Sequence, residues 1–117
     1  MALDTVQDYL DRSRALLQDT IEPYRYGDDL LVSALNLAIM EARRIRPDMF
    51  ESYLGSALPE YSTASLTDDV DIDVQYRSAF MYYMVGHAQL EDQEDNSDAR
   101  ATVFLNKFTA QLRTIEA

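Results

Sequence analysis

Apolar residues recur along this chain with the period of a helix. The clearest stretch is 28–46, where they fall at spacings of three, four and seven, which predicts an amphipathic helix of about five turns. Asp28 and Asp29 suit the positive end of its dipole, and Pro47 stops it. The stripe consists of Leu31, Ala34, Leu35, Ala38, Ala42 and Ile45. A second apolar set indicates packing on two sides, or on one side and against a partner: Leu30, Leu37 and Met40.

The same pattern predicts three further helices, at 4–21, 74–91 and 97–115. Thr5 and Asp8 have the spacing of a capping box at the start of the first helix. The third is apolar on nearly every side between Ala79 and Val85, which is typical of a helix at the centre of a bundle. We therefore predict an all-α fold, a four-helix bundle in a single domain that covers residues 1–117.

The stretch between the second and third helices, 49–73, shows no helical stripe. Ser, Thr and aspartates dominate its second half. A loop of this length in a small domain is usually functional or disordered. We therefore predict an extended arm that reaches a neighbouring subunit or another partner. Its apolar residues are spaced like anchors for a partner's groove: Leu54, Leu58, Tyr61 and Leu66.

Composition excludes several classes of protein. The 117 residues are 47% hydrophobic, enough for a core, and three Gly and three Pro are too few for an all-β domain of tight turns. The chain has no Cys, so neither disulfides nor thiol chemistry are available, and its single His excludes a multi-histidine metal site. It lacks an apolar run of membrane-spanning length and the basic start of a signal peptide, which predicts a chain that is cytosolic when made and has no membrane partner.

The net charge of −11 argues against a general nucleic-acid-binding surface. Solubility explains such a charge without any function. Two functional explanations stay open, namely repulsion of DNA and docking onto a basic protein.

Candidate catalytic and metal sites are weak. Asp69, Asp71 and Asp73 alternate like the start of a calcium loop, but Val74 stands where such a loop needs glycine and Phe80 where it needs glutamate. His87 lies on a helix, without a nucleophile in a recognisable motif beside it. We therefore expect neither an enzyme nor a protein with a metal or cofactor.

The one concentrated basic group consists of Arg43, Arg44 and Arg46. These arginines could simply complement the dipole at the end of the second helix. The alternative is that they anchor an interface by pairing with carboxylates of a neighbour, for which the guanidinium fork is well suited. The eight tyrosines favour the second interpretation, since Tyr is enriched in protein interfaces.

Several short motifs, taken in order, resemble a known family. They are Leu16-Leu-Gln-Asp19, Asp28-Asp-Leu-Leu31, Asn36, Glu41-Ala-Arg-Arg-Ile-Arg-Pro-Asp48, Tyr76-Arg-Ser-Ala-Phe-Met-Tyr-Tyr83, Ala88-Gln-Leu-Glu-Asp92, Ala99-Arg-Ala101 and Asn106-Lys-Phe108. The series spans all four predicted helices. Its order and spacing resemble the head-to-tail adaptor (connector) proteins of tailed bacteriophages.

The resemblance implies a structural virion protein with a helical bundle and an extended arm. Members of that family form a ring, usually of twelve copies, below the portal, and the ring joins the DNA-filled capsid to the tail. The implied partners are further copies of the chain, the portal protein and a tail or nozzle protein. DNA would pass through the lumen without specific binding, and the implied location is the head–tail interface of the virion. Relatives often have a longer middle segment than 49–73.

Two competing functions belong to other classes. A monomeric acidic interaction module, such as a DNA mimic or an inhibitor, would bind a basic protein as a single subunit. A helical enzyme with a carboxylate-bound metal would need acids that face inward from its helices. Most acids here lie at predicted helix ends and in loops, so the enzyme ranks last.

Overall fold

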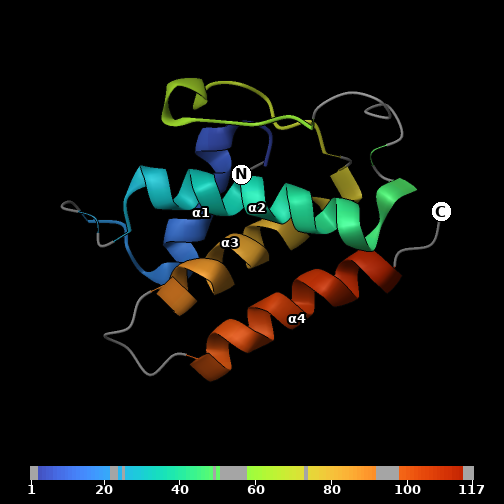
Figure 1. Cartoon of the computed structure of the whole chain (residues 1–117). Helices are drawn as coiled ribbons and strands as arrows, with labels where there is room; N and C mark the ends of the chain where they lie inside the picture. Colours follow the sequence, from blue (N-terminus) through green and yellow to red (C-terminus); the bar gives the residue numbers. More distant parts are fainter. Residues whose placement is uncertain are drawn as a thin grey trace.

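The computed structural model describes residues 3–21, 24, 26–48, 50, 58–72, 74–91 and 98–114. Within these ranges the chain forms four α-helices: α1 (Val6–Leu17), α2 (Asp28–Ile45), α3 (Arg77–Glu91) and α4 (Asp98–Thr114). Two short 3-10 turns, η2 (Thr63–Ser65) and η3 (Val74–Tyr76), lie before α3. The prediction of an all-α four-helix bundle is confirmed (Figure 1).

Helix α3 occupies the centre of the bundle and packs against the other three helices. Phe80 and Met84 on this helix are fully buried, as its all-round apolar pattern predicts. The Phe80 ring meets the Phe108 ring of α4 edge-on, with centroids 5.7 Å apart, a favoured aromatic geometry. The core thus depends on contacts between segments that are distant in the sequence.

Helix α4 runs beside α3 (Figure 1). Gly86 lies at their closest approach, because a Cβ atom there would stand 2.9 Å from Leu105 Cγ and 3.0 Å from the backbone oxygen of Ala101. Any larger residue at position 86 would push the two helices apart. The absence of a side chain therefore sets the spacing of α3 and α4.

Helix α1 begins as predicted and ends earlier. The Thr5 hydroxyl accepts a hydrogen bond from Asp8 N and the Asp8 carboxylate accepts one from Thr5 N, which makes a capping box. The prediction that the helix continues to residue 21 is wrong, since α1 stops at Leu17. Gln18 adopts a left-handed conformation with φ of 58°, and the next N–H, of Asp19, bonds to the Arg14 carbonyl. Ile21, which the pattern placed on the apolar side, is consequently 83% exposed.

Arg14 organises the turn that follows α1. Its guanidinium is buried, and Nη2 donates to the Tyr26 carbonyl over 2.9 Å and to Asp28 Oδ1 over 2.6 Å. The Tyr24 ring stacks on the same guanidinium at 4.1 Å. The Asp19 carboxylate, 4.0 Å away, accepts the N–H of Tyr26. One buried cation thereby connects the end of α1 to the start of α2.

Residues 58–72 lie against α1 and α2 of their own domain. Val6 N donates to Asp68 O and Val70 N donates to Asp4 O, which forms a short antiparallel contact with the chain just before α1. Val70 and Ile72 are buried in the core. The described part of the predicted arm is irregular, as expected, but it is docked on the bundle and does not extend freely from it.

Candidate interaction surface between α2, α3 and α4

A shallow hollow of about 350 Å³ opens on the surface where α3 lies between α2 and α4. Its lining combines apolar and aromatic side chains with polar groups, and Met40 of α2 is 60% exposed. Leu90, on its wall, is 45% exposed. The lining residues are Glu41, Tyr83, His87, Leu90, Leu105, Phe108 and Thr109. Concave apolar surfaces of this kind are typical of binding sites.

Aromatic rings shape the inner wall of this hollow. Tyr83 stacks on His87 with the ring planes 8° apart, and it meets Phe108 edge-on with centroids 4.9 Å apart. Burial, together with the nearby negative charge of Glu41, raises the pKa of the Tyr83 hydroxyl, which therefore stays neutral at physiological pH. The wall is thus a rigid apolar surface with a hydroxyl and an imidazole as polar groups.

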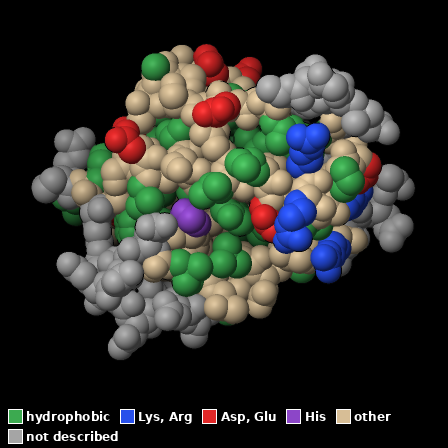
Figure 2. All heavy atoms as spheres, in the orientation of Figure 1, with side chains coloured by type: hydrophobic (Ala, Val, Ile, Leu, Met, Phe, Trp, Pro, Cys, Tyr) green, Lys and Arg blue, Asp and Glu red, His purple; other side chains and the backbone are tan. Residues whose placement is uncertain are grey.

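Arg44 borders the hollow on the side of α2. Arg44 donates through Nε to Glu41 Oε1 over 2.9 Å and bonds the same oxygen through Nη2, so its guanidinium lies beside the wall that Glu41 forms. Arg113 on α4 is exposed as well, and so is Arg43, which lies two residues after Glu41 and therefore on the opposite side of α2. Figure 2 shows the Lys and Arg side chains of this face gathered toward one side of it, with carboxylates mostly at the top and left. The hollow therefore combines apolar and polar groups in its walls with the Arg44–Glu41 ion pair at its edge.

The predicted arginine group divides into two parts. Arg43 and Arg44 point to solvent, where a partner could reach them. Arg46 instead bonds within the domain, because Nη1 donates to the Leu112 carbonyl of α4 over 2.5 Å while Nε and Nη2 hold Asp48 at 3.0 and 2.8 Å. These contacts lower the pKa of the Asp48 carboxyl. Arg46 thus has a structural role in this fold, beside any role in an interface.

The predicted anchors of the arm do not line the hollow. Leu58, Tyr61 and Leu66 are partly buried against their own core. Leu54 lies outside the described residues. The Tyr61 hydroxyl accepts the N–H of Asp71 over 3.1 Å and lies 3.4 Å from the Asp69 carbonyl, and burial raises its pKa. In this single chain, the described anchors hold the loop to the bundle.

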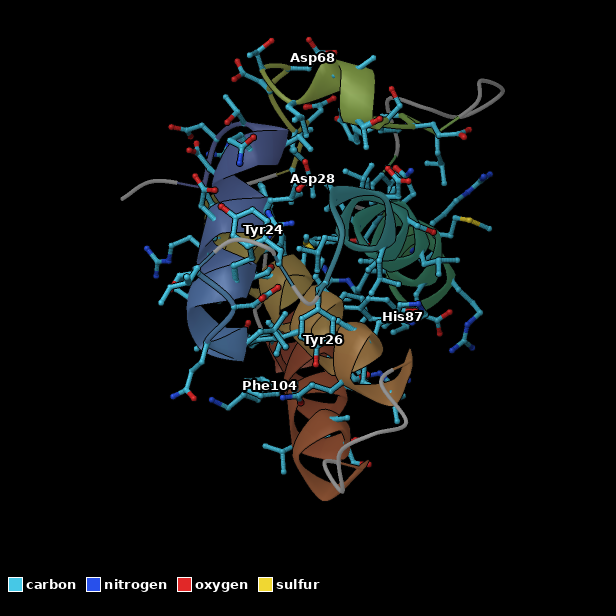
Figure 3. The ribbon with its side chains drawn as sticks, turned by 90° about the vertical axis from the view of Figure 1, so that its left-hand side faces the viewer. Tyr24, Tyr26, Asp28, Asp68, His87 and Phe104 are labelled. Carbon is cyan, nitrogen blue, oxygen red and sulfur yellow. The ribbon has the colours of Figure 1, made fainter. Side chains whose placement is uncertain are left out.

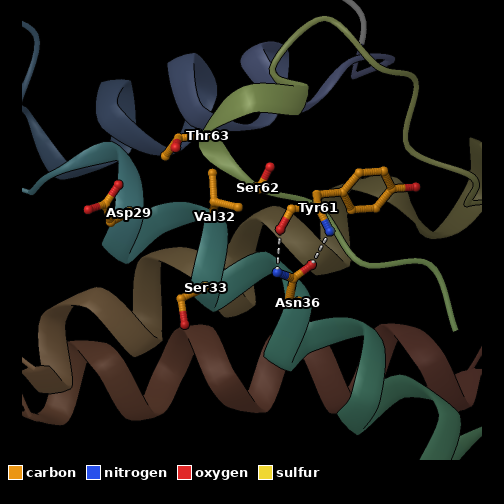
Figure 4. Close-up of a pocket in the computed structure, with 7 residues that line it drawn as sticks. All are labelled: Asp29, Val32, Ser33, Asn36, Tyr61, Ser62 and Thr63. Carbon is orange, nitrogen blue, oxygen red and sulfur yellow. Dashed lines mark hydrogen bonds between the residues drawn. The ribbon is translucent and has the colours of Figure 1, made fainter.

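A second hollow, of about 230 Å³, separates this loop from α2 (Figure 4). The Asn36 amide bonds both backbone groups of Tyr61 at its edge. Its lining residues are Asp29, Val32, Ser33, Asn36, Tyr61, Ser62 and Thr63. The lining carries hydroxyls, an amide and one carboxylate beside apolar groups, and the Asn36 amide docks the loop.

Pattern analysis of the sequence missed the α3 and α4 residues of the first hollow. Tyr83, His87 and Phe108 all fit the apolar stripes of their helices, so each was assigned to the core or left as a packed residue. Met40, in the second apolar set of α2, was the one signal of an uncovered apolar surface.

The part of the chain that the structure describes contains neither a cluster of metal ligands nor a membrane-spanning helix. It contains no group of three or more His, Asp or Glu side chains that could hold a metal ion. Its helices are too short or too polar to cross a bilayer.

No protein-family model matches the chain, and the searches of curated proteins and of solved structures also return no match.

Proposed function

We propose that this chain is a head-to-tail adaptor of a tailed bacteriophage, a structural subunit that assembles into a ring below the portal. The observation that carries the proposal is the presence of two unlike exposed surfaces on one small domain. One is the face with the hollow, where Lys and Arg side chains gather on one side, and the other is rich in carboxylates. A ring subunit needs two such surfaces, because each copy presents a different face to its left and right neighbours.

The carboxylate-rich surface includes the exposed residues Asp4, Asp68, Asp69 and Asp71 around the start of α1 and the docked loop. Arg77 neutralises part of it by bonding Asp4 Oδ1 through Nη1 over 2.6 Å. Figure 3 shows Asp68 at the outer edge of the domain, on the docked loop. Attraction between this surface of one copy and the arginines of the next would favour association in one orientation.

The family resemblance adds a second line of support. Asp28, Asn36 and Arg46 all belong to the motifs that carry it, and each makes a tertiary contact in this fold: with Arg14, with Tyr61 and with Leu112 respectively. Residues that hold a shared framework together are expected to recur among relatives. The net charge of −11 would also let DNA pass through a ring without adhering to it.

Electron microscopy of the purified protein, alone and mixed with a portal ring, tests the proposal. Rings with an open lumen are expected in at least one of the two samples. The variants Arg43→Glu and Arg44→Glu should reduce ring formation while circular dichroism stays that of the parent. A monomer in both samples would overturn the proposal, and tight binding of that monomer to a basic protein would favour the acidic interaction module.

A further inference from the structure

The first turn of α1 is capped by the docked loop as well as by its own residues. The first N–H groups of a helix have no partner within that helix. Here Val6 N donates to the Asp68 carbonyl over 3.0 Å, and Gln7 N donates to the Leu66 carbonyl over 2.9 Å. Detachment of the loop would leave both of these donors without their partners. The loop 58–72 and the first turn of α1 should therefore open and close together.

The loop is held by few buried side chains. Of residues 58–72, only Val70 and Ile72 are buried, and the turn η2 buries none of its side chains. The smaller hollow, of about 230 Å³, separates part of the loop from α2. Segments with little buried apolar surface are the ones that open most readily in a folded protein. The docked state of the loop is thus sensitive to modest forces between the charges at its surface.

Carboxylates crowd both sides of the contact between the loop and α1. Residues 58–72 carry four acidic and no basic side chains, and residues 3–11 carry three acidic and no basic ones. Thr5 pairs with Asp69 in the short antiparallel contact, which brings the two acidic segments side by side. The charges of the loop aspartates add to burial in raising the pKa of the Tyr61 hydroxyl. Because like charges repel, the loop docks against an electrostatic resistance.

Arg77 offsets part of this repulsion. Its Nη1 donates to Asp4 Oδ1 over 2.6 Å and its Nε donates to the Ile72 carbonyl over 2.8 Å, so the start of α3 is bonded to both sides of the contact. One guanidinium leaves most of the carboxylates on the two segments uncompensated. No three His, Asp or Glu side chains of the described residues are grouped so that they could hold a metal ion. Dissolved salt ions should therefore screen the remaining repulsion.

We propose that the loop 58–72 and the first turn of α1 form one conformational switch, which docks when the carboxylates of the two segments are screened and opens when they are not. Docking gathers Asp4, Asp68 and Asp69 into one acidic surface, and opening disperses that surface. The expected effect of salt is the reverse of its effect on a contact held by ion pairs, which salt weakens.

In a ring, the neighbouring copy would close the switch. This step rests on the proposed function, in which the acidic surface of one copy meets arginines of the next. Positive charge placed over the carboxylates relieves their mutual repulsion, so it favours the docked loop. By thermodynamic linkage, a copy with a docked loop also binds its neighbour more tightly, because its acidic surface is already assembled. Ring assembly and ordering of the loop are thus coupled.

Amide hydrogen exchange of the free chain tests the switch at about 0.01 M and about 0.15 M salt, between which the Debye length falls from about 30 Å to about 8 Å. Exchange of the Val6, Gln7 and Val70 N–H groups should be several-fold slower at the higher concentration, while exchange in α3 should change little. Asp69→Asn should slow the same amides at the lower concentration. The matched control is Asn106→Lys, an equal change in net charge at an exposed position of α4, which lies on the opposite side of the domain from the loop (Figure 1).

Exchange that does not slow with salt, or equal slowing by Asp69→Asn and Asn106→Lys, would overturn the switch and leave the proposed adaptor function standing. The coupling to assembly is measured on rings at the same salt concentration, where the three amides should exchange more slowly than in the free chain. Equal rates in rings and free chain would overturn the coupling. A chain that shows the salt dependence but never forms rings, with or without the portal, would overturn the adaptor function and leave the switch itself.

Discussion

The side-chain amide of Asn36 binds both backbone polar groups of Tyr61. Asn36 Nδ2 donates to the Tyr61 carbonyl over 2.8 Å, and Tyr61 N donates to Asn36 Oδ1 over 2.9 Å (Figure 4). The amide replaces the partner that a neighbouring β-strand would supply to an extended segment. This pair fixes the docked loop to the middle of α2.

Asn36→Ala should detach the first half of the docked loop. The substitution leaves the N–H and the carbonyl of Tyr61 without their partner in a partly buried position, and loss of such a partner costs about 1–3 kcal/mol. Amide hydrogen exchange at residues 58–62 should accelerate more than exchange in α3. Ser33→Ala, one turn earlier on the same helix, is the control and should leave exchange in the loop unchanged. Unaltered protection of Tyr61 N–H in Asn36→Ala would show that other contacts hold the loop.

Arg14→Met should destabilise the domain strongly. Removal of one partner of a buried charge pair costs about 3–5 kcal/mol, because the remaining charge is left uncompensated. Here the groups left behind are the Asp28 carboxylate, 2.6 Å from the guanidinium, and the buried Asp19 carboxylate, which keeps the bond from Tyr26 N. Urea denaturation measures the loss, and Arg43→Met, at an exposed site, should change stability little. If the charge is the cause, the double variant Arg14→Met with Asp19→Asn should lose less free energy of unfolding than the sum of the losses in the two single variants. Additive losses would instead point to packing.

Charge reversal should separate Arg46 from Arg43. Arg46→Glu breaks the bond to the Leu112 carbonyl and sets two carboxylates, those of residues 46 and 48, against each other. Its thermal midpoint should fall clearly below that of the parent. Arg43→Glu, which alters an exposed position, should melt close to the parent. Equal midpoints would mean that the link between α2 and α4 contributes nothing to stability.

Gly86→Ala should destabilise the contact between α3 and α4 in spite of the better helix propensity of alanine. The added methyl group would stand 3.0 Å from the Ala101 backbone oxygen, which cannot move without moving α4. Overpacking of this kind typically costs about 1–3 kcal/mol, and the propensity gain of up to about 1 kcal/mol offsets only part of it. Gly27→Ser is the contrasting variant, since position 27 has open space and is the N-cap of α2 without a side-chain bond. It should melt at or slightly above the parent midpoint.

The capping box of α1 should make part of the stability depend on pH. Hydrogen bonds from the backbone of Thr5, and more weakly from Asp4, lower the pKa of the Asp8 carboxyl below its ordinary value. A lowered folded-state pKa contributes stability above the unfolded-state pKa, and this contribution disappears as the pH falls through the folded-state value. The parent should therefore have a higher urea midpoint than Asp8→Ala at pH 6, and the difference between the two midpoints should be smaller at pH 3. A constant difference would show that the carboxylate charge is not involved.

Helix α2 shows why part of this fold could be predicted from the sequence. Its start at Asp28 and its end before Pro47 depend on local chemistry, namely carboxylates at the positive end of a dipole and a residue that cannot donate a backbone hydrogen bond. Local preferences and the apolar stripe agree there. The capping box at Thr5 was predictable for the same reason, since its partners are three residues apart.

The candidate surface was less predictable, because its parts come from three helices. The arginines were visible as a group in the sequence. The hydrogen bond from Arg46 to the Leu112 carbonyl, however, joins residues 66 positions apart, and no local pattern indicates it. The hollow exists because α3 lies between α2 and α4 and leaves one side of Tyr83 and His87 uncovered. Helical periodicity indicates that such residues share a face, but not whether another element covers that face.

The sequence by itself determined the helical class, the extent of α2 and the central place of α3, because periodicity and capping act over a few residues. The end of α1 and the position of the 58–72 loop were decided by tertiary structure. Arg14 is buried only because Tyr24, Tyr26 and Asp28 fold back over it, and that arrangement accompanies the end of the helix at Leu17. The polar composition of the loop suggested an arm. Its backbone groups nevertheless find partners on α1 and α2, and burial of Val70 and Ile72 helps to offset the entropy of ordering it.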